Sequence, residues 1–86
     1  MTDQTLLALG SIVTAGVTMA VGALGAAVGE SRIGSAGMDA LARQPDEAGA
    51  ITRNQFVALA MIESTAIFCL VIALVLLFAN PFVAGR

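Results

Sequence analysis

The sequence predicts an all-α membrane protein, folded as a two-helix transmembrane hairpin. Of its 86 residues, 58% are hydrophobic and 12% are charged, whereas charged residues make up about 25% of a typical soluble domain. A soluble chain of this size hides only about 60% of its surface on folding, so membrane lipid must be the solvent for many of these side chains. Two long apolar runs flank a polar segment that holds three of the four arginines. This arrangement predicts two spans joined by a loop.

The first span is residues 6–28, which contain no charged side chain. A helix of that length rises about 34 Å, enough to cross the roughly 30 Å hydrocarbon core. The second span is residues 56–79, where Glu63 is the single charge and Asn80-Pro81 ends the helix, because proline lacks the N–H that a helix needs. We expect one domain over residues 1–86, with a first helix over about 5–42, a loop over about 43–46 and a second helix over about 47–79.

The arginines predict the orientation in the membrane. Arg32, Arg43 and Arg53 lie between the spans, the N-terminal segment has no basic residue, and the C-terminal segment has Arg86 alone. Loops rich in Lys and Arg stay on the cytoplasmic side. The loop is therefore expected in the cytoplasm, and both termini on the opposite side of a membrane that the chain crosses twice.

Composition excludes several classes of function. The net charge is −2, and the chain has no Lys and no His, which argues against a basic nucleic-acid-binding domain and against a histidine-based metal or acid/base site. Cys69 is the single cysteine, so a disulfide framework and a CxxC metal site are excluded as well. We expect Cys69 to be a small buried hydrophobe, and we expect no resident metal or cofactor.

The first span is rich in small residues. Seven glycines occur between positions 10 and 37 and none between 50 and 84, although glycine costs about 1 kcal/mol relative to alanine in a helix. Stripes of small residues let membrane helices approach closely. A single hairpin cannot crowd its first helix on two sides, so the stripe predicts a homo-oligomer with first helices side by side and bulky second helices facing lipid. The stripe comprises Ser11, Ala15, Thr18, Gly22, Gly25 and Gly29.

Glu63 is the candidate functional residue, because an ionised carboxylate in a membrane span costs several kcal/mol unless it is paired, neutralised or bound to a cation. Such residues mark ion or proton pathways. The alternative is a protonated Glu63 that makes only a helix–helix hydrogen bond, but a Gln would make that bond without a charging penalty.

Glu30 is expected at the same depth, since the midpoint of positions 30 and 63 falls at 46.5, where Pro45 predicts the turn. The alternative is that Glu30 lies at the lipid boundary and pairs with Arg32. Ser64 and Thr65 add hydroxyl oxygens beside Glu63, which suit a hard cation or a hydrogen-bonded proton.

Four features occur together over nearly the whole chain: the Gly- and Ala-rich first helix, Ala42-Arg43-Gln44-Pro45, Glu63-Ser64-Thr65-Ala66 and Phe78-Ala79-Asn80-Pro81. With these features the chain resembles one family, the c subunit of rotary F-type ATP synthases, which is the proteolipid of the rotor ring. The resemblance implies a homo-oligomeric ring in a bacterial inner membrane, with the first helix inside and the second outside. ATP chemistry then belongs to other subunits, and this chain is not an enzyme.

The resemblance also implies site residues. The carboxylate matching Glu63 binds H⁺ or Na⁺ and releases it at the a subunit of the stator, where an arginine attends the exchange. The Met61 carbonyl, Ser64 and a water held by Thr65 would complete the ion shell. The loop residues Arg43, Gln44 and Pro45 would contact the central stalk.

Two departures from the family pattern stand out. Glu30 replaces the Gln that commonly faces the carboxylate, and paired acids of this kind resemble the N-type branch. Many members have glycine at every second position of the first helix; this chain has Ala23, Gly25, Ala27, Gly29 and Ser31. Larger contact side chains widen helix spacing, so we expect a ring larger than is typical.

We expect the transported ion to be H⁺. Na⁺ remains the alternative, on a shell of Glu63, Ser64, Thr65 and Glu30; against it, Phe68 stands where Na⁺-binding relatives commonly carry a Tyr. Two alternatives of another class are a pore-forming, holin-like hairpin and a purely structural membrane protein, neither of which needs two acids at one depth.

Overall fold

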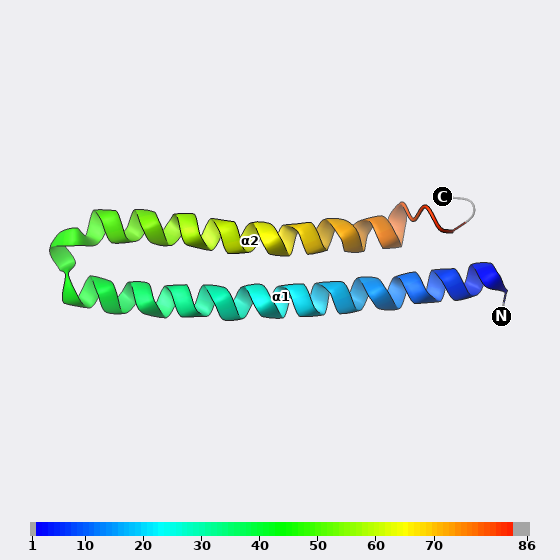
Figure 1. Ribbon diagram of the computed structural model, residues 1–86, viewed down its shortest axis with the longest axis horizontal. Coiled ribbons are helices and arrows are strands. Elements are labelled where there is room, and N and C mark those ends of the chain that lie inside the picture. The colour runs from blue at the N-terminus through cyan, green and yellow to red at the C-terminus, as the bar shows by residue number, and fades with distance from the viewer. Residues whose placement is uncertain (1, 84–86) are drawn as a thin grey trace.

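The computed structural model describes residues 2–83 as two long antiparallel helices joined by a tight turn (Figure 1). Helix α1 spans Asp3–Arg43, a 3₁₀ turn η1 spans Pro45–Glu47, and helix α2 spans Ala48–Phe78. The molecule measures 64 × 17 × 9 Å. Both helices are long and apolar enough to cross a membrane. The hairpin predicted from the hydropathy pattern is the observed fold.

The helix bounds differ from the expected ones by one or two residues at each end. Helix α1 begins at Asp3 because the Thr2 hydroxyl accepts a hydrogen bond from the Thr5 N–H at 3.1 Å, the usual N-cap arrangement. It ends at Arg43, since Pro45 disfavours a helical conformation at Gln44, whose φ and ψ are −135° and 69°. Glu47, expected as the first residue of the second helix, belongs instead to the 3₁₀ turn with Pro45 and Asp46.

The end of α2 is capped by the chain that follows it. The Ala79 N–H donates to the Val75 carbonyl at 3.0 Å, and the Asn80 side-chain amide donates to the Leu76 carbonyl at 3.2 Å. The Phe82 N–H then donates back to Asn80 Oδ1 at 2.8 Å. Pro81 in this turn cannot continue the helix, so the chain leaves α2 after Phe78.

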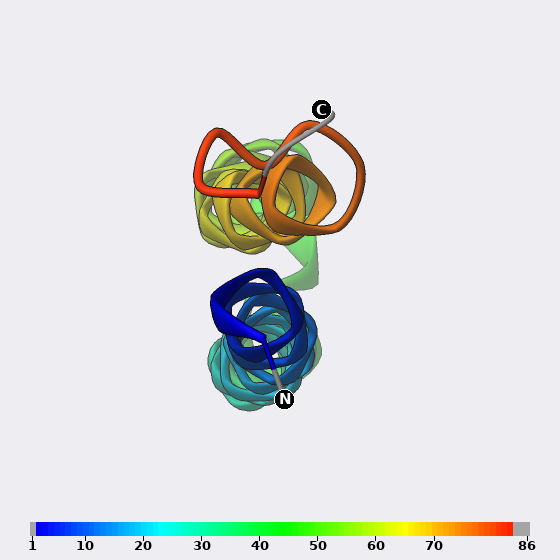
Figure 2. The same ribbon diagram turned by 90° about the vertical axis from the view of Figure 1, so that its right-hand side faces the viewer.

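The two helices lie side by side along their whole length, as Figures 1 and 2 both show. Close approach is possible because α1 offers small side chains to α2. A Cβ at Gly22 would lie 2.7 Å from Cys69 Sγ, and a Cβ at Gly29 would lie 3.3 Å from Ile62 Cδ1. The side chain of Gln55 covers Gly37 in the same way. The buried residues of α1 are Ser11, Ala15, Ala26 and Gly37, and Ala73 is the buried residue of α2.

This packing corrects the interpretation of the small-residue stripe. Ser11, Ala15, Gly22 and Gly29 face α2 of the same chain, whereas the sequence suggested contact with neighbouring first helices. A stripe on a helix indicates close packing but not the identity of the covering helix. Gly25 is exposed, and a Cβ added there would meet nothing within 4 Å.

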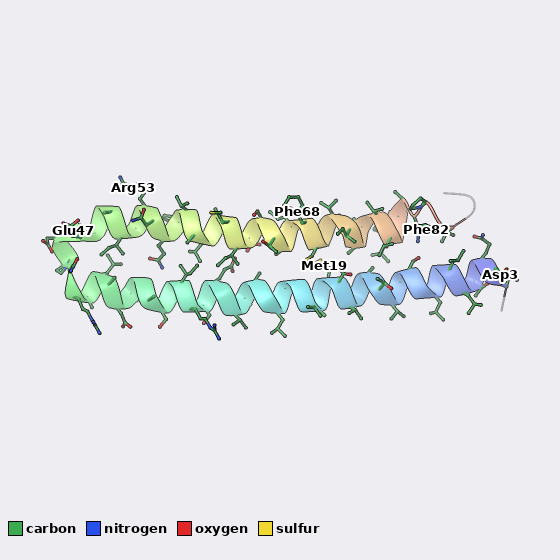
Figure 3. The ribbon with its side chains drawn as sticks, in the orientation of Figure 1. Asp3, Met19, Glu47, Arg53, Phe68 and Phe82 are labelled. Carbon is green, nitrogen blue, oxygen red and sulfur yellow. The ribbon has the colours of Figure 1, made fainter. Side chains whose placement is uncertain are left out.

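The outer surface of the hairpin is strongly apolar. Phe68 and Phe78 on α2 are 69% and 71% exposed, and large aliphatic side chains cover the rest of that helix. Figure 3 shows Phe68 on the side of α2 that faces away from α1. A surface of this kind needs lipid or further protein to cover it.

Candidate ion-binding site

The site lies between the two helices at the middle of α2. Glu63 lies midway along Ala48–Phe78, and Glu30 lies opposite on α1. Both carboxyl groups line one open cavity of about 220 Å³. The two side chains thus share this cavity from opposite helices.

The local packing explains why the two acids meet. The residues that precede them, Gly29 and Ile62, are in direct contact across the helix interface. One further residue along each antiparallel helix places Glu30 and Glu63 within about 3 Å of the same level. Each acid is rotated about 100° from that contact because a helix has 3.6 residues per turn. In antiparallel helices these rotations point to the same flank of the pair, which brings both carboxyl groups to one side of the hairpin.

The surroundings of the two carboxyl groups are apolar. The cavity is otherwise lined by Met19, Ala23, Ala26, Ala27, Ala66, Ile67 and Leu70, and Figure 3 shows Met19 directed from α1 toward α2. Small alanine side chains leave the space that the carboxyl groups occupy. Within residues 2–83 no ion pair joins Glu30 to Arg32, the alternative raised by the sequence; Glu30 faces Glu63 instead.

Three further candidates lie elsewhere on α2. The Ser64 hydroxyl donates to the Met61 carbonyl at 2.6 Å, and neither residue lines the cavity of Glu63. Thr65 is exposed and is rotated about 200° from Glu63 around the helix axis. The hairpin alone brings together Glu30 and Glu63, but Met61, Ser64 and Thr65 lie on other sides of α2.

The remaining candidates occupy the turn and the outer side of α1. Arg43, Gln44 and Pro45 are exposed at the end of the hairpin remote from both termini (Figure 1), and Arg43 and Gln44 line an open depression of about 420 Å³. On α1, Ala23 and Ala27 line the carboxyl cavity, and Ser31 is exposed.

One polar contact was not expected from the sequence. Asn80, interpreted as part of a helix stop, donates a side-chain hydrogen bond to the Ser11 hydroxyl at 2.5 Å. Asn80 is 1% exposed and Ser11 is 9% exposed. The available signal was an Asn immediately before Pro at a helix end, which is a common turn former; nothing in the local pattern indicated its partner.

Comparison with known proteins places these features in context. The sequence matches the family described as the C subunit of ATP synthase over residues 13–76. It is 55% identical over 82 residues to the ATP synthase c subunit numbered 2 of Cereibacter sphaeroides (strain ATCC 17029 / ATH 2.4.9), covering 95% of this chain and 98% of that protein. It is 49% identical over 73 residues to the ATP synthase c subunit of Petrotoga mobilis (strain DSM 10674 / SJ95), covering 85% and 76% of the two chains.

Proposed function

The chain belongs to the family of ATP synthase c subunits, and from this premise we propose that its Glu63 carries the ion that the rotor ring moves across the membrane. Members of the family are non-catalytic ring subunits, so ATP chemistry takes place on other subunits. Membership also sets aside the pore-forming and purely structural alternatives. The observation that carries the proposal is a titratable side chain midway along an apolar helix, sharing one cavity with a second carboxyl group.

The charge of Glu63 determines where in its cycle it can face lipid. An ionised carboxylate is costly in hydrocarbon, whereas a protonated acid is tolerated. Glu63 therefore crosses the lipid-facing part of each turn in its neutral form, loaded with H⁺. It releases the proton where a positive charge compensates the carboxylate, the role that the family assigns to an arginine in the a subunit of the stator. Each loading and release advances the ring by one hairpin.

Glu30 acts as the second partner of the carried proton. Two carboxyl groups in a site of low dielectric constant cannot both be ionised without a cation, so one proton is shared between them. The apolar lining of the cavity supports this role, because alanine and larger aliphatic side chains offer no compensating charge.

Selectivity for H⁺ over Na⁺ must be large. Na⁺ is roughly 10⁵-fold more abundant than H⁺ at neutral pH, and at about 1.4 kcal/mol per tenfold the site needs about 7 kcal/mol of preference. The apolar cavity and the shared proton both favour the neutral acid. Phe68, which has no hydroxyl to donate to an ionised carboxylate, favours it too.

Na⁺ transport is the second candidate, and one contact supports it. The Ser64 hydroxyl oxygen and the Met61 carbonyl oxygen lie 2.6 Å apart, so two hard oxygen ligands are already close together on α2 beside Glu63 in the sequence. These oxygens and Thr65 lie away from the Glu63 flank. A neighbouring copy that packs its Thr65 flank against the Glu63 flank would supply the missing ligands, and Glu30 would complete the shell.

The same proposal extends to the assembly. Ala23, Ala27 and Ser31, standing where many members carry glycine, add side chains between inner helices and favour a ring larger than is typical. The exposed turn of Arg43, Gln44 and Pro45 is the surface offered to the central stalk. Arg32, Arg43 and Arg53 favour a cytoplasmic position for that turn in a bacterial inner membrane, with both termini on the other side.

Carbodiimide labelling tests the ion and its carrier together. A hydrophobic carbodiimide reacts with a protonated acid within the lipid, so labelling of Glu63 should fall as pH rises and should be unchanged by excess Na⁺. A Glu30→Gln ring is the control that shows which carboxyl group reacts. If millimolar Na⁺ protects Glu63 from labelling at constant pH, the transported ion is Na⁺ and not H⁺. Labelling confined to Glu30 would refute the role of Glu63.

A further inference from the structure

We propose that Asn80 is a positioning residue, which fixes the axial register of α2 against α1 and so keeps Glu63 level with Glu30. The inference rests on the proposed ion-carrying role of that pair. Asn80 is almost completely buried, with 1% of its surface exposed. It follows α2 directly and contacts the first part of α1, at the end of the hairpin remote from the turn.

The hydrogen bonds of Asn80 fix the orientation of its side-chain amide. The Leu76 carbonyl can only accept and the Phe82 N–H can only donate, so Nδ2 is the atom 3.2 Å from Leu76 O and Oδ1 is the atom 2.8 Å from Phe82 N. Nδ2 therefore also donates to Ser11 Oγ at 2.5 Å. Two of these bonds hold Asn80 to its own segment, and the third joins that segment to α1.

The rest of the helix interface fixes the register only in part. The face of α1 toward α2 carries Ala15, Gly22, Ala26, Gly29 and Gly37, which recur at multiples of about one helical turn. A slide of α2 by one turn would move Cys69 from Gly22 to Thr18 or Ala26, whose side chains would crowd it. Close packing therefore disfavours neighbouring registers through crowding, without a specific pair of polar partners.

The Ser11 hydroxyl supplies such a partner. One turn away toward the N-terminus stand Leu7 and Ala8, whose side chains cannot accept a hydrogen bond; one turn the other way, Ala15 is buried and Thr14 is exposed beside it. A slide toward Ala8 would leave the buried Asn80 amide N–H without its partner, which is unfavourable in an apolar environment. A slide the other way would offer only the hydroxyl of Thr14, on an exposed side of α1.

The hairpin is thus fixed at two places, with the carboxyl pair between them. One is the tight turn, where the Gln44 N–H donates to Ala40 O and the Glu47 N–H to Gln44 O. The other is the Asn80–Ser11 bond, about 50 Å further along α1 at 1.5 Å per residue. Glu30 lies between these points, and its contact with Glu63 depends on both.

Disulfide formation between helices measures this register without using ion chemistry. The reporter is the full chain in membranes with Cys69→Ser, Glu30→Cys and Glu63→Cys, oxidised under fixed conditions and dissociated before electrophoresis, so that intrachain bonds are separated from interchain ones. Ser11→Ala removes the interhelical bond and leaves the bonds of Asn80 to Leu76 and Phe82 in place. The intrachain rate should fall at least about threefold, because disulfide formation requires a narrow range of Cα separations.

Two matched variants complete the experiment. Ser11→Thr keeps a hydroxyl and should restore the rate, and Ser35→Ala makes the same chemical change at an exposed position of α1 and should leave it unchanged. The inference is overturned if both Ser11→Ala and Asn80→Ala retain the parent rate, or if Ser35→Ala lowers it equally. Oxidation is carried out on whole membranes without purification of rings, so a variant that forms no ring is still measured. If Glu63→Gln rings transport ions, the proposed function fails, but these rates do not change.

Discussion

Replacing Gly22 by alanine should force the two helices apart, and the structure gives the size of the displacement. An alanine Cβ at this position would lie 2.7 Å from Cys69 Sγ and 2.8 Å from Cys69 Cβ. The sulfur can move away by rotation about χ1, but the Cβ is fixed to the backbone of α2. Ordinary contact begins at 3.4 Å, so α2 must move by about 0.6 Å, the difference between 3.4 and 2.8 Å.

A displacement of this size in a close-packed interface costs about 1–3 kcal/mol. Gly25→Ala is the matched control, since it makes the same change three residues along the same helix where a Cβ meets nothing within 4 Å. On helix propensity alone Gly25→Ala should be neutral or stabilising. The pair of variants separates crowding from the general effect of removing a glycine.

Thermal dissociation of detergent-solubilised rings, followed by gel electrophoresis, is the appropriate assay. The Gly22→Ala ring should dissociate at a lower temperature than the parent. Gly25→Ala creates no crowding within the hairpin, so it should not lower the dissociation temperature by this route. Adding Cys69→Gly to Gly22→Ala removes the opposing Cβ and should recover much of the loss. Equal dissociation temperatures for Gly22→Ala and the parent would refute the close contact, as would a failure of Cys69→Gly to recover stability.

Two further changes test the proposed function. Glu63→Gln should assemble into rings, because the glutamine has nearly the same shape, and should transport no ions; normal ATP-driven pumping by such rings in vesicles would contradict the role of Glu63. Ala23→Gly combined with Ala27→Gly should reduce the number of hairpins in the ring by narrowing the spacing of inner helices, and an unchanged number by native mass spectrometry would argue against that explanation.

The hairpin and the level of the two acids could be predicted because each depends on local information. Apolar runs longer than the bilayer core define the spans, and Pro45 defines the turn. Once the turn is known, antiparallel geometry places Glu30 opposite Glu63. The cavity that both acids line agrees with this symmetry about the turn.

Two features could not be predicted from the sequence. They are the direction in which a side chain points around its helix axis and the contacts between residues far apart in the chain. Ser64 and Thr65 follow Glu63 in sequence, yet each step of one residue turns the side chain by about 100°, so neither shares its cavity. The bond between Ser11 and Asn80 joins residues 69 positions apart. Neither residue has a pattern that identifies the other, because a serine in a small-residue stripe is equally suited to packing.

Glu30 and Glu63 lie on a single flank of the hairpin. The two flanks that face the neighbouring copies around a ring are therefore different. Neighbouring copies in a ring of many hairpins are related by a small rotation about the ring axis and not by a two-fold axis, so every contact is heterologous and joins unlike flanks. Each carboxyl pair then has a leading neighbour and a trailing neighbour that present different side chains to it. Clockwise and anticlockwise steps past a fixed stator are therefore chemically distinct events, because the stator meets the acidic flank of each hairpin first in one direction and last in the other.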